Sequence, residues 1–164
     1  SSLAACGGDD VPAPQPVAPV TEAPAPAPTP APAPPPDFDG PALELTLAPV
    51  GNEMQFAQTE ISAQAGQTVR ITFTNTADNP AMSHNVVVLA AGTDVNAFGR
   101  AAMSAAETDY IPSEMNSSVL ANTSMAAPGE TVTVEFTAPA AGTYTYVCTY
   151  PGHFMSMQGT LTVA

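Results

Sequence analysis

The residues with the clearest chemical potential lie in one short segment near the C-terminus, Cys148-Thr-Tyr-Pro-Gly-His153-Phe-Met-Ser-Met157. The segment places a thiolate, an imidazole and a thioether within ten residues. Pro151 and Gly152 favour a bend that lets His153 turn back toward Cys148. Two imidazoles and one thiolate in a plane, with a weak axial thioether, are the ligands of an electron-transfer copper site. The segment therefore predicts such a site, with one imidazole still to be supplied.

The missing imidazole has one source, because the chain contains two His and the second is His84, at the start of a Val-rich segment. Taken singly, a Cys near a strand end is usually an apolar core residue, and a lone His or Met is usually structural. The combination Cys-x4-His-x3-Met with an upstream His favours a metal site instead. Its predicted ligands are His84, Cys148, His153 and Met157, and Met155 stays open as a competing thioether.

The surrounding segments alternate apolar and polar side chains, as half-buried strands do. The expected strands cover residues 42–47, 54–56, 68–74, 84–89, 131–136, 143–149 and 159–163, with 117–125 as a further candidate. Residues 95–106 form the one expected helix, with Asp94 as a candidate N-cap, although Gly99 weakens that expectation. Seven or eight short strands with one helical insertion predict an all-β fold, namely a β-sandwich.

The chain divides into a tail and a domain at about residue 37. Residues 11–36 contain 12 of the 19 Pro. Repeated Pro locks φ and removes N–H donors, so this stretch should be extended and reach roughly 80 Å at about 3.1 Å per residue. We expect residues 1–37 to be a disordered Pro/Ala-rich linker and residues 38–164 to form one domain with its own core.

The first residues carry a second motif, Leu3-Ala-Ala-Cys6, which has the form of a bacterial lipobox. In that reading Cys6 becomes the lipidated first residue of the mature protein. We therefore expect an exported bacterial protein anchored to the outer face of a membrane, in the periplasm or another extracytoplasmic space. The alternative is a chance Cys in a tail. Either way Cys6 and Cys148 are two separate thiols with separate roles.

The charge is strongly acidic, with 15 Asp and Glu against two Arg and a net charge of −13. Such a surface repels nucleic acid and anionic lipid headgroups. It favours a partner with a basic docking face, although it also fits a simple need for solubility.

Three segments resemble the azurin and auracyanin branch of the cupredoxins. They are Met54-Gln-Phe56, Met82-Ser-His84-Asn85 and Cys148-Thr-Tyr-Pro-Gly-His153-x3-Met157-x-Gly159. The resemblance covers about residues 42–164, and the lipobox and Pro-rich tail are most similar to the auracyanins. It implies a Greek-key β-sandwich and one type 1 (blue) copper that cycles between Cu(II) and Cu(I).

The resemblance also implies roles for the neighbours of the ligands. Asn85 would connect the His84 strand to the ligand loop near Thr149, and the backbone N–H groups of Asn85 and Tyr150 would donate to the Cys148 sulfur. Ser83 stands where azurins have Gly, whose carbonyl is a distant axial contact. An apolar docking patch around His153 would consist of Met82, Pro151, Phe154 and Met155.

The predicted function is therefore electron transfer by a monomer that is not an enzyme. The expected partners are redox proteins, such as a membrane quinol-oxidising complex, a c-type cytochrome or a photosynthetic or respiratory acceptor. Copper storage or delivery is the alternative, because the chain has seven Met. A copper oxidase or nitrite reductase would need further His, and zinc could occupy the same ligands.

Overall fold

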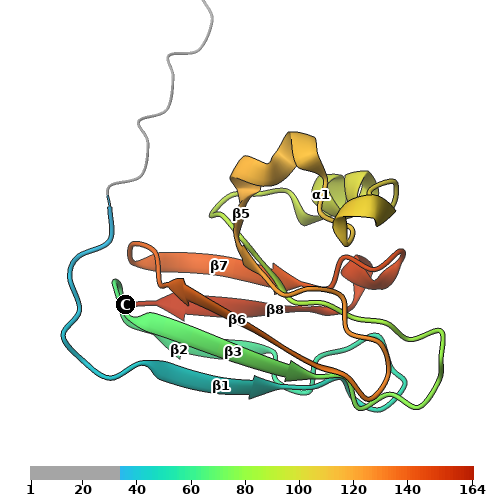
Figure 1. Ribbon diagram of the computed structural model, residues 1–164. Helices are drawn as coiled ribbons and strands as arrows, with labels where there is room; N and C mark the ends of the chain where they lie inside the picture. The colour runs from blue at the N-terminus through green and yellow to red at the C-terminus, as the bar shows by residue number, and fades with distance from the viewer. Residues whose placement is uncertain (1–33) are drawn as a thin grey trace, which may run out of the picture. The chain divides into compact units, whose positions relative to one another are not determined.

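The computed structural model describes residues 34–164. Cys6, the lipobox and most of the Pro/Ala-rich linker lie outside these residues. The structure contains eight strands, one α-helix and three 3₁₀ turns (Figure 1). The strands are β1 (Leu43–Leu47), β2 (Glu60–Ala63), β3 (Thr68–Thr74), β4 (Val87–Leu89), β5 (Val119–Asn122), β6 (Thr131–Thr137), β7 (Gly142–Val147) and β8 (Gln158–Val163).

Two stacked sheets confirm the predicted all-β sandwich. One sheet has the order β1-β3-β6 and the other has the order β2-β8-β7-β4-β5 (Figure 1). The alternation in β3 shows why the sheets stack, since Val69, Ile71 and Phe73 are buried while Thr68 and Arg70 are exposed. A strand with one apolar face buries that face only against another layer.

Four of the expected strands differ clearly in the structure. The expected strand 117–125 is reduced to β5, and the expected strand 143–149 ends with β7 at Val147, so that Cys148 and Thr149 lie in the ligand loop. Met54 lies in a bend, and Phe56 forms only an isolated bridge with Pro49. The expected strand 84–89 is regular only from Val87, because His84 pairs with Ala126 in an isolated bridge. The strand β2 was not expected. It has only four residues, and its parallel pairing with β8 stabilises it where its short local pattern does not.

The helical insertion follows β4. The helix α1 covers Val95–Ala102, and Asp94 caps it by accepting hydrogen bonds from the backbone N–H of Asn96 at 2.8 Å and Ala97 at 3.0 Å. It ends four residues earlier than expected, and the 3₁₀ turns η1 (Ala106–Thr108) and η2 (Ser113–Ser118) follow it. Within residues 34–164, no helix is long and apolar enough to span a membrane.

Tyr146 on β7 is a central core residue and lies two positions before Cys148. It is fully buried, its ring packs against Phe56 at a centroid distance of 5.3 Å, and its hydroxyl donates to the Gln58 carbonyl at 2.5 Å. Its partner across the β7–β8 ladder is Gly159. A Cβ on Gly159 would overlap the phenol ring, so this glycine makes room for the ring that supports the end of β7.

We expect Gly159→Ala to destabilise the protein by about 1–3 kcal/mol, because a buried ring cannot move aside without losing its hydrogen bond. Urea unfolding measures this effect. Gly142→Ala in the same strand pair is the matched control, since its Cβ would find its nearest neighbour at 3.5 Å, in ordinary contact. Equal stability of the two variants would contradict this account of the core.

Candidate metal centre

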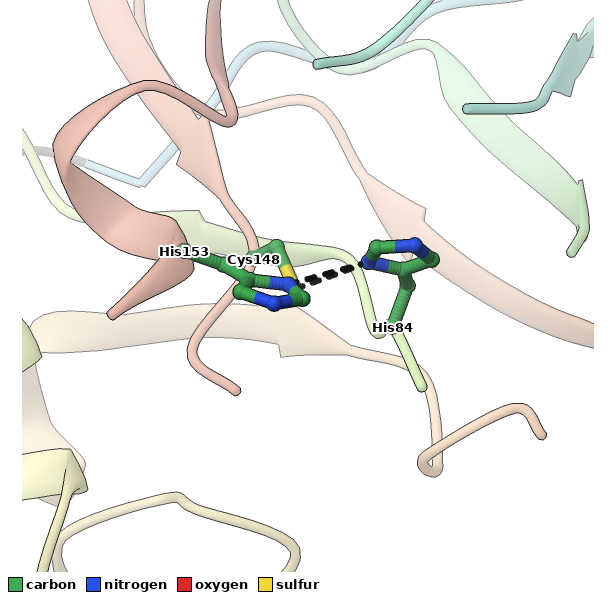
Figure 2. Close-up of side chains that lie close together, drawn as sticks. All are labelled: His84, Cys148 and His153. Atoms are coloured by element: carbon green, nitrogen blue, oxygen red, sulfur yellow. Dashed lines mark hydrogen bonds between the residues drawn. The ribbon is translucent and has the colours of Figure 1, made fainter. Parts of the chain in front are cut away.

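Three predicted ligands converge on one point in the structure. Figure 2 shows the imidazole of His84 facing the imidazole of His153, with the sulfur of Cys148 beside them. The two Nδ1 atoms are 3.1 Å apart. The Sγ of Cys148 lies 3.8 Å from Nδ1 of His84 and 3.7 Å from Nδ1 of His153. Side chains separated by 64 residues of sequence therefore form one triangle of donor atoms.

The size of this triangle matches a metal ion. A circle through three points with these separations has a radius of about 2.1 Å, which is the range of metal–nitrogen and metal–thiolate bonds. The triangle has only acute angles, so a central ion would lie inside it, as in a trigonal site. His84 and Cys148 are fully buried and His153 is 4% exposed. The donors thus form a closed site that is shielded from bulk solvent.

The protonation states also suit a metal ion. Burial, with a smaller contribution from the charge of His153, lowers the pKa of His84 to about 4, and burial lowers the pKa of His153 as well. Burial raises the pKa of the Cys148 thiol to about 11, although the backbone N–H groups of Asn85 and Tyr150 act in the opposite direction. At neutral pH the metal-free imidazoles are therefore neutral and ready to coordinate, and metal binding must displace the thiol proton.

The ligand loop closes on itself at both ends. The backbone N–H of Cys148 donates to the carbonyl of Met157 at 2.9 Å, and the N–H of Met157 donates to the carbonyl of His153 at 2.8 Å. Gly152 has a φ of 83° and makes the bend expected before His153, which begins the 3₁₀ turn η3 (His153–Met155). Only Gly adopts such a φ without strain. The loop therefore returns His153 to the Cys148 side.

Burial separates the two candidate thioethers. Met157 is fully buried and belongs to the same core cluster as Cys148, whereas Met155 is 68% exposed. Of the two, only Met157 has its side chain in the interior that the triangle occupies.

His84 is fixed by its bridge to Ala126. Its N–H donates to the Ala126 carbonyl at 3.1 Å, and its carbonyl accepts from the Ala126 N–H at 2.8 Å. The buried side chain of Asn75 donates to the same Ala126 carbonyl at 3.0 Å and to the Met82 carbonyl at 2.7 Å, which fastens the turn before His84. Ser83, between this turn and His84, is half-buried. The Nε2 atom of His84 is buried with no hydrogen-bond partner in the described part of the chain.

Asn85 joins the His84 segment to the ligand loop, as the family resemblance implied. Its Oδ1 accepts from the N–H of Thr149 at 2.8 Å, and its Nδ2 donates to the Thr149 hydroxyl at 2.8 Å. The register Val87↔Val147 of the β4–β7 pair explains this contact, because two further residues along the ladder bring Asn85 opposite Thr149. Nδ2 also donates to the carbonyl of Asp109 at 3.2 Å, a contact with the insertion that the sequence did not reveal.

The expected docking patch is only partly at the surface. Met82 and Pro151 are half-buried, and Met155 is exposed. The prediction that Phe154 belongs to an exposed patch is wrong, because Phe154 is 4% exposed and packs in a core cluster with residues of the insertion. The physical reason is that α1 covers the ring of Phe154. The sequence pattern predicts a helix there but not where that helix packs.

A further apolar side chain at this surface escaped the sequence analysis. Met54 is 44% exposed and shares with Met82 an open groove of about 600 Å³. The hydroxyl of Ser156, in the ligand loop, donates to the Met54 carbonyl at 3.0 Å and forms part of the same groove. The only signal for Met54 was its place in one of the segments that resemble azurin.

Comparisons with known proteins agree with this site. The model of the copper binding proteins, plastocyanin/azurin family, matches residues 44–164. Auracyanin-A of Chloroflexus aurantiacus is 42% identical over 115 residues, which make up 69% of each chain. Auracyanin-B of the same organism is 39% identical over 125 residues, or 75% of this chain and 53% of the relative.

Solved structures show the same likeness. The structure of auracyanin A, described as a "blue" copper protein from Chloroflexus aurantiacus, matches with a TM-score of 0.69 and 40% identity, over 76% of this chain and all (100%) of that one. The dithionite-reduced auracyanin of Roseiflexus castenholzii matches with a TM-score of 0.68 and 37% identity, over 76% of this chain and 99% of that one.

The cofactor follows from the donor set and the family match together. The closed triangle of two Nδ1 atoms and one sulfur, with the buried Met157 thioether in the same core, is arranged as a type 1 copper site. Copper is therefore the cofactor, and the predicted resemblance is confirmed: the chain belongs to the plastocyanin/azurin family of copper-binding proteins.

Proposed function

We propose that this protein is a one-electron carrier, with copper held by His84, Cys148, His153 and Met157. The observation that carries the proposal is the buried triangle of donor atoms at 3.1, 3.7 and 3.8 Å. Copper would supply the redox centre, at which one electron is taken up from a donor protein and later released to an acceptor. The protein supplies two neutral imidazoles, a thiolate and a weak thioether, a donor set that suits both Cu(II) and Cu(I).

The way the ligands are held supports rapid transfer. An electron carrier works best when its ligands move little between the two oxidation states, as preorganised sites do. Here the bridge of His84 to Ala126, the Asn85–Thr149 contacts and the closed ligand loop fix the three donors independently of the metal. His153 is the one ligand of the triangle with any exposed surface, so it is the natural exit for the electron.

Electron transfer also fits better than copper storage or delivery. A delivery site must open its donor atoms to the receiving protein, whereas these donors are buried and fixed at both ends of the loop. Catalysis is not expected either, because residues 34–164 contain no second group of three His, Cys, Asp or Glu side chains placed to hold a metal. The expected partners are therefore redox proteins, met at the surface formed by Met54, Met82, Pro151 and Met155.

The proposed location is the outer face of a bacterial membrane, through a lipid on Cys6 and the Pro-rich linker. Two of the similar structures come from photosynthetic bacteria, according to their descriptions. An acceptor in a photosynthetic membrane is therefore one candidate beside respiratory complexes and c-type cytochromes. The acyl-chain mass on Cys6 in the native host tests the anchor, and an unmodified Cys6 would rule it out.

The copper(II) form should show an intense visible charge-transfer band from the Cys148 thiolate, and the band should vanish on reduction. Cys148→Ser should abolish the band, because an alkoxide or hydroxyl does not replace a soft thiolate. Cys6→Ser is the matched control and should keep the band. Absorption spectra of the copper-loaded wild-type, Cys148→Ser and Cys6→Ser proteins measure this band. A colourless wild-type protein would disprove the carrier function.

Met157→Leu should keep the colour and raise the reduction potential, because loss of the axial thioether removes a donor that helps to stabilise Cu(II). Met155→Leu, two residues away and exposed, is the matched control and should leave the potential unchanged. Protein-film or redox-titration voltammetry measures both. A shift in Met155→Leu and none in Met157→Leu would reverse the assignment of the thioether.

Asn85→Ala should lower the free energy of unfolding by about 1–3 kcal/mol, because it leaves the buried N–H of Thr149 without a partner. Chemical unfolding of the copper-loaded protein measures this loss. Asn122→Ala is the control, since that exposed side chain bonds only the adjacent Thr123 carbonyl. A similar stability of both variants would show that the Asn85 contacts do not hold the loop.

A further inference from the structure

The helix α1 lies directly against the turn that carries His153. Figure 1 shows α1 beside the red turn that ends at β8, and the closest meeting point is Gly99 on the ring of Phe154. A Cβ on Gly99 would overlap three atoms of this ring. The helix therefore has a glycine, despite the lower helix propensity of this residue, where the ring needs the space.

Phe154 has no room to retreat from this contact. Its side chain is 4% exposed and closes a second core cluster between the insertion and the sheet. The other buried members of that cluster are Val87, Leu89, Phe98, Ile111 and Val147. Because Phe154 follows His153 in the same 3₁₀ turn, a displaced ring displaces the neighbouring ligand.

The insertion touches the ligand loop at a second place. The ring of Tyr110 meets the ring of Tyr150 edge-on at 5.5 Å, and Tyr150 packs against the imidazole of His153 at 4.9 Å. Asp109 and Tyr110 both have positive φ, at 52° and 60°. Asp tolerates this region but a bulky Tyr is strained in it, and such strain persists only where the surrounding structure imposes it.

We propose that the insertion is a clamp that holds His153 from two sides, through Gly99 on Phe154 and through Tyr110 on Tyr150. Gly99 and Tyr110 are positioning residues, because they act on the copper ligand through another side chain. The clamp rests on the proposed electron-carrier function. It limits the movement of His153 between oxidation states and so keeps electron transfer fast.

Gly99→Ala tests the first contact in the full-length copper-loaded protein. The added methyl group pushes the ring of Phe154 and with it His153. We expect the electron self-exchange rate to fall about tenfold, together with a changed copper hyperfine splitting in the electron paramagnetic resonance spectrum. Asn96→Ala, on the exposed side of the same helix, is the control and should change neither signal.

A double variant separates the contact from general damage to the helix. Phe154→Leu alone should also slow self-exchange, because the ligand turn loses its support. In Gly99→Ala combined with Phe154→Leu, the new methyl group lies where the ring was removed. The double variant should therefore exchange electrons faster than Gly99→Ala alone, which two independent defects would not produce.

Tyr110→Asn tests the second contact and serves if Gly99→Ala fails to fold. Asn tolerates a positive φ, so the backbone strain is relieved while the ring is removed. If Tyr110 only packs in the insertion and does not act on His153, the copper signals stay unchanged, whatever the change in stability. The clamp predicts slower self-exchange and a changed hyperfine splitting. Wild-type rates and spectra in Gly99→Ala, Phe154→Leu and Tyr110→Asn would overturn the clamp, whereas a colourless wild-type protein would overturn the electron-carrier function itself.

Discussion

The antiparallel register of β4 and β7 is the constraint on which the site depends. Val87 opposite Val147 places the segment before β4 beside the residues that follow β7. His84 and Cys148, far apart in sequence, become neighbours through this pairing, and Asn85 comes opposite Thr149. A slip of one residue would reverse the direction in which every side chain of the strand points. The sheet therefore sets the positions of two donors before any metal arrives.

Both the insertion and the sandwich hold the third donor, His153, in place. His153 lies on a loop, and loops are ordinarily the most mobile parts of a fold. Here the loop is closed by hydrogen bonds between Cys148, His153 and Met157, and Phe154 is buried beneath α1. The loop ligand His153 thereby has buried neighbours, as His84 and Cys148 do beside the paired strands.

Much of this arrangement could be predicted from the sequence. The all-β sandwich followed from alternating patterns such as that of residues 68–74, which became β3 without any change of its ends. The donor set followed from the scarcity of His and Cys, because scarce residues leave few combinations. β2 escaped prediction, since its pairing with β8 is a long-range contact that leaves little trace in four residues. Phe154 was placed at the surface because local sequence does not show which helix covers a loop.

The hydrogen bond from Cys148 to Met157 has a consequence for how such a protein can change over time. This hydrogen bond continues the β7–β8 ladder by one step beyond the pair Val147↔Gln158. The ladder therefore ends at Cys148 and Met157, which are the two ends of the ligand loop. Residues 149–156 thus form a segment whose length does not enter the register of either strand. Insertions or deletions there leave the sandwich paired as before. The strand pairing therefore does not restrict the length of the loop, which is instead held to the sandwich by Thr149 and Phe154.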